Sequence, residues 1–286
     1  MSTGYRIVKK EVYSPVTYMW EVEAPDVARM ALPGHFVMVR MNERGERIPL
    51  TVADYDRQRG TVTVVIQAVG KSTREMMRLD EGDSILDFIG PLGEASHIRQ
   101  RSKVVLVGGG LGVAPVYPQL RAFKELGSTT LSIIGFRTKS LVFWEEKFRA
   151  FSDELHIATD DGSYGHKGFV SQVLQVLLDG QHRDAEEIVA IGPLPMMKAC
   201  CDVTRPFGIR TMVSLNSIMV DGTGMCGSCR VTVGGKLKFA CVDGPDFDGH
   251  LVDFDELMRR QRRFLREEQE SLHRYEDECR LTGRLP

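Results

Sequence analysis

The fold of this chain is decided by the stretch KVVLVGGGLGVAPVYPQLRAFKEL, residues 103–126. The continuous apolar run at Lys103–Val107 predicts a strand that is buried on both faces. Three glycines follow it directly, and Val113–Leu126 then shows helical spacing as far as Gly127. A buried strand, a glycine turn and a helix in this order indicate the start of a parallel α/β sheet.

The same alternation continues toward the C-terminus. The strand-like segments are Leu131–Ile134, Leu155–Ala158 and Ile188–Ile191, and the helix-like segments are Trp144–Phe151, Val170–Leu178 and Met196–Val203. Unbroken apolar strands that alternate with helices predict a parallel sheet covered on both faces. We therefore expect an α/β domain over residues 98–211.

Toward the N-terminus the pattern is different. Residues 1–97 hold short segments in which apolar and polar residues alternate: Arg6–Val12, Thr17–Val22, His35–Met41 and Thr61–Val69. Turn sequences such as Pro33-Gly34 separate them. Several short strands at this spacing predict a small β-barrel or sandwich.

Length and composition limit the function classes. A chain of 286 residues suggests two domains at roughly 150 residues each, and 42% hydrophobic residues suffice for real cores. The 37 basic and 39 acidic residues argue against a general nucleic-acid binder. No apolar run reaches the roughly 18 residues of a membrane span, and the N-terminus has no secretory pattern. We expect a cytoplasmic protein without a disulfide framework.

The clearest chemical motif is DGTGMCGSC at residues 221–229, with Cys241 twelve residues later. Glycines around a CxxC let two thiolates turn toward one metal centre, and a hairpin at Gly234-Gly235 would return the third. Asp221 stands five residues before Cys226, where a plant-type cluster would have its first cysteine. Residues 212–252 therefore predict an iron–sulfur module, with a structural zinc site or a hairpin of reduced thiols as alternatives.

A nucleotide site is suggested by loops that follow the apolar strands. Gly108–Pro115 joins a strand to a helix, where glycines let the chain approach a pyrophosphate. The loops at Asp160–Gly165 and Gly192-Pro193 also follow strands, and ligands of parallel sheets bind at the carboxyl ends of strands. Taken alone, each loop is equally typical of a tight strand–helix turn.

Residues 1–97 contain three further segments that suit a flavin. Arg47–Thr51 is expected on a strand, Gln67–Thr73 ends a strand and opens a short helix, and Gly90–Gly93 forms a turn. Hydroxyls at a helix N-terminus can hold phosphate. Without other information, these segments are also ordinary turns and caps.

The last section, residues 253–286, is highly charged. Leu257, Phe264, Leu265 and Leu272 form only a thin apolar stripe. We expect a terminal helix that is either solvated or docked on a partner.

Together, these motifs resemble the ferredoxin–NADP reductase superfamily over about residues 4–255. The markers are RIPLTVAD, VVIQAVGKST, GPLG, VGGGLGVAP, TDDGSYGHKG, GPLPMM, VDGTGMCGSCRV and KFACVDGPDFDGHLVDF. The similarity is greatest to the branch of dihydroorotate dehydrogenase electron-transfer subunits, sulfide dehydrogenase, and the small subunit of NADH-dependent reduced ferredoxin:NADP oxidoreductase. It implies an FAD-binding β-barrel, an α/β domain that binds NAD(H) and a small C-terminal 2Fe–2S module.

The resemblance also assigns residues. The expected FAD contacts are Arg47, Pro49, Leu50, Thr51, Gln67, Gly70, Ser72, Thr73, Gly90 and Gly93. The expected NAD contacts are Gly109, Gly110, Gly112, Arg137, Asp160, Asp161, Gly162, Gly192 and Met196. The expected cluster ligands are Asp221, Cys226, Cys229 and Cys241.

Three positions depart from the wider pattern. Pro49 stands where an aromatic residue would stack on the flavin ring. Ile48 stands where the superfamily has an arginine, so Arg47 is one residue out of step, and such a step along a strand reverses its face. Asp221 replaces the first cysteine of the dihydroorotate branch, and this substitution matches the small subunits of the NADH-dependent oxidoreductase.

The resemblance implies an electron-transfer flavo-iron–sulfur subunit that connects NAD(H), FAD and a 2Fe–2S cluster with a larger flavin and iron–sulfur subunit, in an electron-bifurcating enzyme. No side chain then has to act as an acid or a base. Alternative partners are dihydroorotate dehydrogenase, glutamate synthase or a sulfide or polysulfide reductase. A zinc-binding, non-catalytic module is the alternative from another class. The preference for NAD or NADP stays open, because Arg137 and Lys139 either meet a 2′-phosphate or are solvated.

Overall fold

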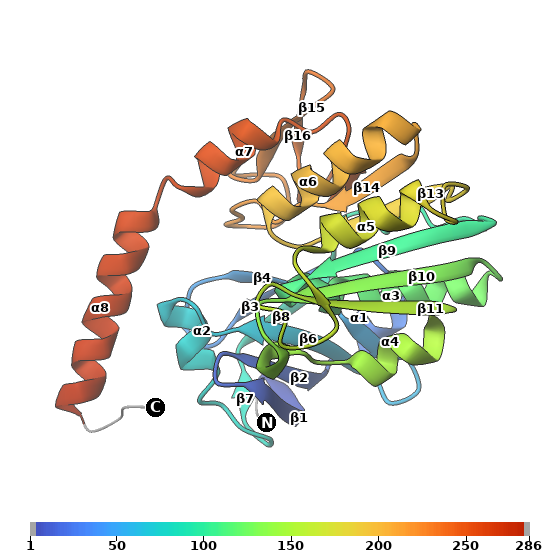
Figure 1. Ribbon diagram of the computed structural model, residues 1–286. Coiled ribbons are helices and arrows are strands. Elements are labelled where there is room, and N and C mark those ends of the chain that lie inside the picture. The colour runs from blue at the N-terminus through green and yellow to red at the C-terminus, as the bar shows by residue number, and fades with distance from the viewer. Residues whose placement is uncertain (1–3, 283–286) are drawn as a thin grey trace.

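The computed structural model describes residues 4–282, and it confirms the predicted fold class (Figure 1). The N-terminal β domain consists of strands β1 (Tyr5–Ser14), β2 (Thr17–Glu23), β3 (Phe36–Arg40), β4 (Ile48–Thr51), β5 (Asp54–Asp56), β6 (Thr61–Gln67), β7 (Ser84–Ile85) and β8 (Asp87–Leu92), with helices α1 (Pro25–Met30) and α2 (Lys71–Met76). Its strands form a five-stranded sheet of order β5-β6-β2-β1-β7 and a three-stranded sheet of order β4-β3-β8.

One apolar core lies between these two sheets. Tyr18 and Trp20 on β2 are fully buried, as are Val37 on β3 and Phe88 on β8. Val37 and Val39 of β3 face this core, whereas the alternate residues Phe36 and Met38 pack on the opposite face of the sheet, in the core shared with the C-terminal module. The three-stranded sheet thereby becomes a fixed wall of the barrel, and its β4 and β8 carry residues expected to contact FAD.

The α/β domain follows, with a seven-stranded sheet of order β12-β11-β10-β9-β13-β14-β17. Its strands are β9 (Lys103–Gly109), β10 (Thr129–Phe136), β11 (Glu154–Thr159), β12 (His166–Lys167), β13 (Glu187–Ile191) and β14 (Arg210–Ser214), with β17 (Asp246–Asp248) at one edge. Its helices are α3 (Val113–Glu125), α4 (Glu145–Phe151), α5 (Val170–Asp179) and α6 (Leu194–Thr204). All neighbouring strands are parallel except β14 and β17, which pair antiparallel.

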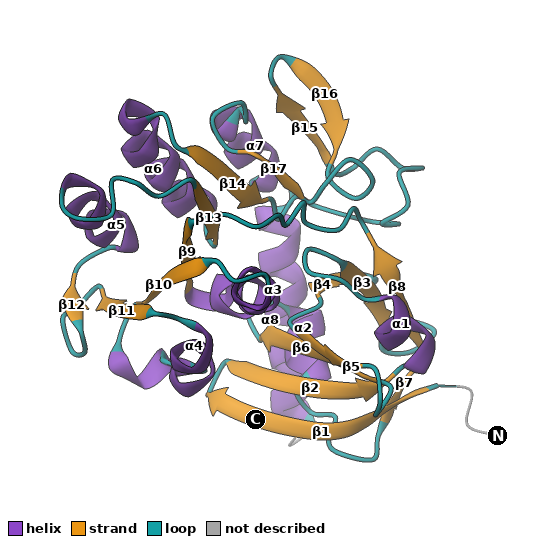
Figure 2. Cartoon of the chain, turned by 90° about the vertical axis from the view of Figure 1, so that its right-hand side faces the viewer, coloured by secondary structure: helices purple, strands orange, loops and turns teal. Residues whose placement is uncertain are grey.

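Successive residues of the central strand β9 serve opposite faces of this sheet. Val104 and Leu106 pack with α3 and α4, whereas Val105 and Val107 pack with α5 and α6. Helices therefore cover both faces, as Figure 2 also shows. This two-sided burial explains why the strand sequence is continuously apolar.

The expected helices and strands differ from the structure at several places. The sequence predicts a turn at Gly90–Gly93, but its first three residues belong to strand β8 (Asp87–Leu92), in which Leu92 pairs with Phe36 of β3. Helix α4 begins at Glu145, because Trp144 is left-handed (φ 62°) and serves as its N-cap. Arg47 is exposed and lies just before β4 instead of on a strand. The predicted boundary between residues 211 and 212 falls inside β14, which continues the parallel sheet.

The C-terminal module consists of a hairpin, β15 (Arg230–Val233) and β16 (Lys236–Phe239), together with the edge strand β17. Gly234 and Gly235 form the expected turn, both with positive φ (58° and 73°), as a two-residue hairpin turn requires. Because β17 pairs with β14, the module is attached to the α/β sheet. Cys241 follows β16 closely and is buried.

Two helices, and not one, form the C-terminal section: α7 (Phe254–Gln261) and α8 (Leu265–Leu281). Phe254 and Leu257 of α7 are buried in the α/β core, whereas Tyr275 and Cys279 of α8 are buried elsewhere. The chain bends between the helices so that both pairs of residues can pack. Residues 283–286 of the predicted section lie outside the described residues.

Helix α8 runs down the side of the molecule toward α2 (Figure 1). Glu276 forms an ion pair with Arg74 of α2 (2.7 Å). The guanidinium of Arg78 lies over the Tyr275 ring at 5.1 Å and donates to Cys279 Sγ at 2.9 Å. The helix is thus docked on this chain along one face.

The β domain and the α/β domain are joined by an aromatic contact and an ion pair. Trp144 Nε1 donates a hydrogen bond to the Tyr13 hydroxyl (2.7 Å), and Phe143 stacks on the Tyr13 ring. Arg121 of α3 forms an ion pair with Asp54 (2.6 Å). These contacts hold the carboxyl ends of the parallel strands beside the barrel. No helix among residues 4–282 is long and apolar enough to span a bilayer.

Candidate functional site

The three-stranded sheet brings together two of the segments expected to bind a flavin. Thr51 of β4 and Leu92 of β8 both pair with Phe36 of the central strand β3. Pro49 and Thr51 are half-buried and Leu50 is buried, so this wall offers a largely apolar surface with one hydroxyl. Such a surface suits the flat, mostly apolar ring of a flavin.

The segment before α2 offers an open turn. A Cβ on Gly70 would have no heavy atom within 4 Å, so space is free at the start of this helix. The Thr73 hydroxyl accepts the backbone N–H of Gly70 at 3.1 Å and thus caps the helix. Ser72 Oγ donates to the Glu46 carboxylate, and Gln67 ends β6 beside this turn. The turn fits a phosphate group only if Ser72 leaves Glu46.

The expected nucleotide residues meet at the carboxyl ends of β9 and β13. A Cβ on Gly112 would lie 2.2 Å from the carbonyl oxygen of Ile191, so only glycine lets α3 start this close to β13. A Cβ on Gly109 would lie 2.2 Å from Met196 Sδ, and one on Gly192 would lie 2.9 Å from the same atom. Met196 therefore lies between the two glycine loops.

The loop after β11 is held by its own side chains. Asp161 accepts from the Ser163 hydroxyl at 2.6 Å and from its backbone N–H at 2.9 Å, and these bonds lower the pKa of the carboxyl. Asp160, Asp161, Gly162 and Arg137 are all exposed at the same end of the sheet. They lie where a nucleotide of a parallel sheet would bind.

The cysteine loop has an unusual backbone. Gly222, Gly224 and Gly227 all adopt positive φ (74°, 86° and 67°), which turns backbone N–H groups toward the inside of the loop. The carboxylate of Asp221 accepts from the N–H of Thr223 (2.8 Å) and from that of Cys226 (2.7 Å). These hydrogen bonds, that of Thr223 foremost, lower the pKa of Asp221.

Two of the four expected ligands lie together. The Sγ atoms of Cys229 and Cys241 are 3.2 Å apart, both side chains are buried, and neither forms a disulfide. Burial, aided by the hydrogen bond with Cys229, raises the pKa of the Cys241 thiol. A metal would therefore have to displace a proton there.

The other two expected ligands do not join this pair. Cys226 is exposed and Asp221 bonds to backbone, and among residues 4–282 no three His, Cys, Asp or Glu side chains are gathered to hold one metal ion. The donor set still fits an iron–sulfur cluster, because a cluster bonds to soft thiolates and accepts backbone N–H groups at its sulfurs.

The cysteine loop, residues 221–229, packs directly on the three-stranded sheet β4-β3-β8, which carries expected FAD contacts and is called the flavin wall below. A Cβ on Gly222 would lie 2.8 Å from Met38 Cγ of β3 and 3.2 Å from Leu92 Cδ1 of β8. The loop with three of the four possible cluster ligands is therefore in van der Waals contact with the sheet that carries Pro49–Thr51. This contact joins residues more than 120 positions apart, and it brings the expected cluster ligands next to the expected FAD contacts.

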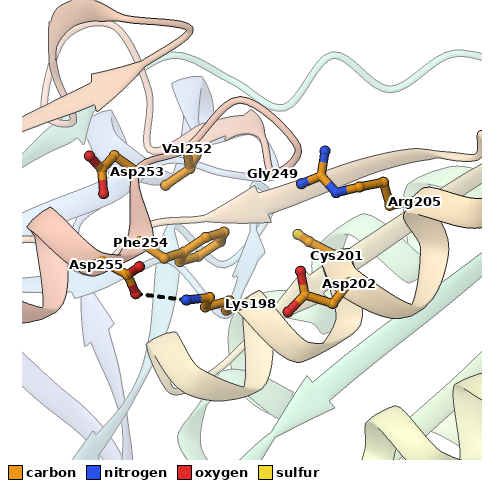
Figure 3. Close-up of a pocket in the computed structure, with 9 residues that line it drawn as sticks. All are labelled: Lys198, Cys201, Asp202, Arg205, Gly249, Val252, Asp253, Phe254 and Asp255. Carbon is orange, nitrogen blue, oxygen red and sulfur yellow. Dashed lines mark hydrogen bonds and ion pairs between the residues drawn. The ribbon is translucent and has the colours of Figure 1, made fainter.

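A hollow between α6 and the start of α7 lies apart from these loops (Figure 3). Lys198 and Asp255 form an ion pair across it at 2.7 Å. Cys201 lines it but is buried, and burial raises the pKa of its thiol to about 12. This cysteine is a packing residue, and so is the fully buried Cys200.

The sequence reasoning missed several residues that shape the site. Glu46 faces Ser72, and Met38 and Leu92 support the cysteine loop. Asp246 joins the module to both other domains. No local sequence signal identifies them, because each acts through a partner that is distant in the chain.

Comparisons with known proteins agree with this geometry. Residues 216–253 match the model of the iron–sulfur cluster binding domain of dihydroorotate dehydrogenase B. A dihydroorotate dehydrogenase B (NAD(+)) electron transfer subunit homolog of Thermotoga maritima is 46% identical over 269 residues, covering 94% of each chain. The electron transfer subunit of Fusobacterium nucleatum is 33% identical, covering 84% of this chain and 93% of the relative.

Solved structures give the same picture. A chain in the structure of the NADH-dependent reduced ferredoxin-NADP oxidoreductase, studied for flavin-based electron bifurcation, superposes with a TM-score of 0.90 at 44% identity. The match covers 96% of this chain and 99% of that one. A ferredoxin NADP+ reductase from Neisseria gonorrhoeae is only 15% identical (TM-score 0.58, 72% of this chain and 91% of that chain), and this likeness shows the fold alone.

Proposed function

Since the chain belongs to the family of dihydroorotate dehydrogenase B electron transfer subunits, we propose that it passes electrons between NAD(H), FAD and a 2Fe–2S cluster to a larger partner subunit. It is a ferredoxin reductase-like oxidoreductase subunit. The observation that carries the proposal is the contact of Gly222 with Met38 and Leu92, which joins the cysteine loop to the flavin wall. An electron can pass directly between two such sites without a mobile carrier.

Separate groups of residues would bind FAD, NAD(H) and the cluster. Pro49, Leu50 and Thr51 would face the flavin ring. The turn at Gly70–Thr73 and the end of β8 at Gly90–Gly93 would hold its phosphates, with Gln67 and Arg47 nearby. The loops at Gly109–Gly112, Asp160–Gly162 and Gly192, with Met196 and Arg137, would hold NAD(H). Asp221, Cys226, Cys229 and Cys241 would hold the cluster. When bound, a flavin exchanges a hydride with a nicotinamide and releases electrons singly, which a 2Fe–2S cluster requires.

The partner we propose is a larger flavin and iron–sulfur subunit, in an electron-bifurcating NADH-dependent ferredoxin:NADP oxidoreductase. The support is the 44% identity and the TM-score of 0.90 to a chain of that enzyme over nearly its whole length. Asp221, which stands in place of the first cysteine of the dihydroorotate branch, also supports this partner. A cytoplasmic location is consistent with six free cysteines, three of which this function requires to stay reduced for iron.

The experiment that tests the function is anaerobic affinity purification of the tagged chain from its native host, followed by identification of the co-purifying subunits and by absorption and EPR spectroscopy. We expect FAD, iron, NADH-dependent bleaching and a large flavin and iron–sulfur subunit. A dihydroorotate-oxidising partner would contradict the proposed assignment to a bifurcating enzyme and would leave the electron-transfer role intact. Bound zinc without flavin would overturn both.

The surface that meets the partner is proposed on the cysteine module. Five large apolar side chains are exposed there: Val220, Met225, Leu237, Val242 and Leu251. Exposed apolar side chains gathered on one small module are typical of a protein interface. Arg230 and Arg262, both exposed, suit the rim of such an interface, where arginine is enriched.

We expect Leu237→Glu with Leu251→Glu to weaken binding of the larger subunit by at least about tenfold, because two charges would enter an apolar contact. Both side chains are more than half exposed (59% and 53%), and so the fold should persist. Size-exclusion chromatography of the co-expressed complex measures the effect. Val176→Glu, at a residue that is 65% exposed on α5, is the matched control. Equal loss in both variants would contradict this placement.

The role of Asp221 has its own test. Asp221→Cys is expected to change the EPR spectrum and midpoint potential of the cluster, because a thiolate replaces a harder carboxylate, while flavin reduction by NADH stays unchanged. Asp221→Asn separates the roles, because the amide oxygen can still accept from the loop N–H groups of Thr223 or Cys226. If both variants have the wild-type spectrum, Asp221 caps the loop and is no ligand.

A further inference from the structure

A carboxyl group lies where the three parts of the molecule meet. Asp246 Oδ2 accepts a hydrogen bond from Ser96 Oγ at 2.6 Å and another from Gln119 Nε2 at 3.1 Å. Ser96 lies in the connection between the β domain and the α/β domain, and Gln119 is a buried residue of α3. Asp246 itself starts β17, five residues after Cys241. One oxygen atom thus binds two donors from two other parts of the chain.

The backbone around Asp246 strengthens this junction. The N–H of Glu94 donates to the carbonyl of Gly244 at 2.6 Å, and the N–H of Leu215 donates to that of Pro245 at 2.9 Å. A Cβ on Gly93 would lie 3.0 Å from the same Gly244 oxygen. Gly93, at the end of the β8 segment proposed to hold flavin phosphates, therefore packs directly on the segment that leads to Asp246.

Burial of the Asp246 carboxyl group at this junction costs free energy of folding. Its Oδ1 is buried and has no hydrogen-bond partner among residues 4–282, although the Ser214 hydroxyl faces the same carboxyl. Burial raises the pKa of Asp246, against the opposing effect of Ser96, Ser214, Gln119 and His97. A buried acid with one unpaired oxygen destabilises the fold. Its presence therefore indicates that this position serves another purpose.

We propose that Asp246 is a positioning residue that fixes the flavin turn, the nucleotide helix α3 and the cysteine loop relative to one another for electron transfer. The inference rests on the proposed function. Arg121–Asp54 joins only the two larger domains, and its side chains are partly exposed. Among the hydrogen bonds and ion pairs of the described residues, the Asp246 carboxyl alone bonds to both other parts at once.

The test compares Asp246→Ala with Asp248→Ala in the anaerobic holoprotein. Asp248 is a matched control, because it lies on the same strand and its carboxyl accepts only the local N–H of His250 (3.0 Å). Stopped-flow spectroscopy separates flavin reduction by NADH from cluster reduction, and hydrogen–deuterium exchange reports on residues 90–96, 113–121 and 241–246.

We expect Asp246→Ala to keep its FAD and iron, to exchange faster in all three segments, and to reduce the cluster roughly tenfold more slowly, because misplaced centres react more slowly. The control should keep the wild-type rate. Faster exchange confined to β17 with an unchanged rate, or equal slowing in the control, would overturn the inference. If the wild type lacks flavin or cluster absorption, the proposed function fails instead.

Two further variants keep the inference testable if Asp246→Ala does not fold. Asp246→Asn retains an oxygen acceptor, and so it should restore most of the rate. Ser96→Ala removes one of the two donors and should slow the cluster step without changing the spectrum. Wild-type behaviour of Ser96→Ala, or a loss in Asp246→Asn as large as that in Asp246→Ala, would overturn the inference.

Discussion

Replacing Cys241 with serine is expected to remove the cluster while the flavin reaction continues. The side chain is buried and its Sγ lies 3.2 Å from that of Cys229, so no other residue of the module can take its place. A serine oxygen is a harder ligand than a thiolate and binds the cluster iron less well. Iron content and the EPR signal of the reduced protein should fall nearly to zero, and NADH-dependent reduction of ferricyanide should persist.

The control for this prediction is Cys201→Ser. Cys201 is equally buried, but it lies beside Gly249 in the wall of the hollow between α6 and α7. This variant should lose some stability because a hydroxyl is buried, and it should keep its full iron content. Full iron content in Cys241→Ser would contradict the ligand assignment. Loss of iron in both variants would indicate a folding defect and no ligand role.

Loss of the cluster should also loosen the module. Metal binding contributes directly to the folding of small metal sites, and the hairpin β15–β16 has few other buried side chains, chiefly Val231. We therefore expect limited proteolysis to cut Cys241→Ser within residues 221–240 and to leave the barrel and the parallel sheet intact.

Much of the fold could be predicted because the α/β section has strong local patterns. The apolar runs at 103–107 and 188–191 are buried on both faces of the sheet, so their sequences alone identify them as strands. The short strands β5, β7, β12 and β17 have two or three residues each and show no period. They exist only because a neighbouring strand offers free backbone groups. The sequence reasoning therefore could not find them.

In the site, too, features with a local sequence pattern could be predicted and contacts between distant segments could not. The glycine loops could be placed because the carboxyl ends of parallel strands meet at one edge. The contact of Gly222 with Met38 could not, because it depends on how β17 attaches the module to the α/β sheet. Asp246 is a similar case, since Ser96 and Gln119 lie 150 and 127 residues away in the chain.

The second large effect is expected at Gly112. A Cβ there would lie 2.2 Å from the Ile191 carbonyl oxygen and 2.7 Å from Gly192 Cα, and both belong to the backbone of the sheet. Gly112→Ala must therefore push α3 away from β13. We expect a loss of about 3 kcal/mol, as for overpacking of a tight core, which lowers the thermal midpoint of the holoprotein by roughly 6–12 °C.

NADH binding should suffer as well, because the helix that moves begins at the proposed nucleotide site. We expect the apparent affinity for NADH, measured by titration of flavin reduction, to fall about tenfold while FAD stays bound. Gly110→Ala is the control in the same loop: its Cβ would meet nothing within 4 Å, and only its φ of +55° opposes the change. That strain costs about 1–2 kcal/mol, so the control should lose less stability. Equal losses in the two variants would mean that backbone conformation, and not the approach of α3 to β13, governs this loop.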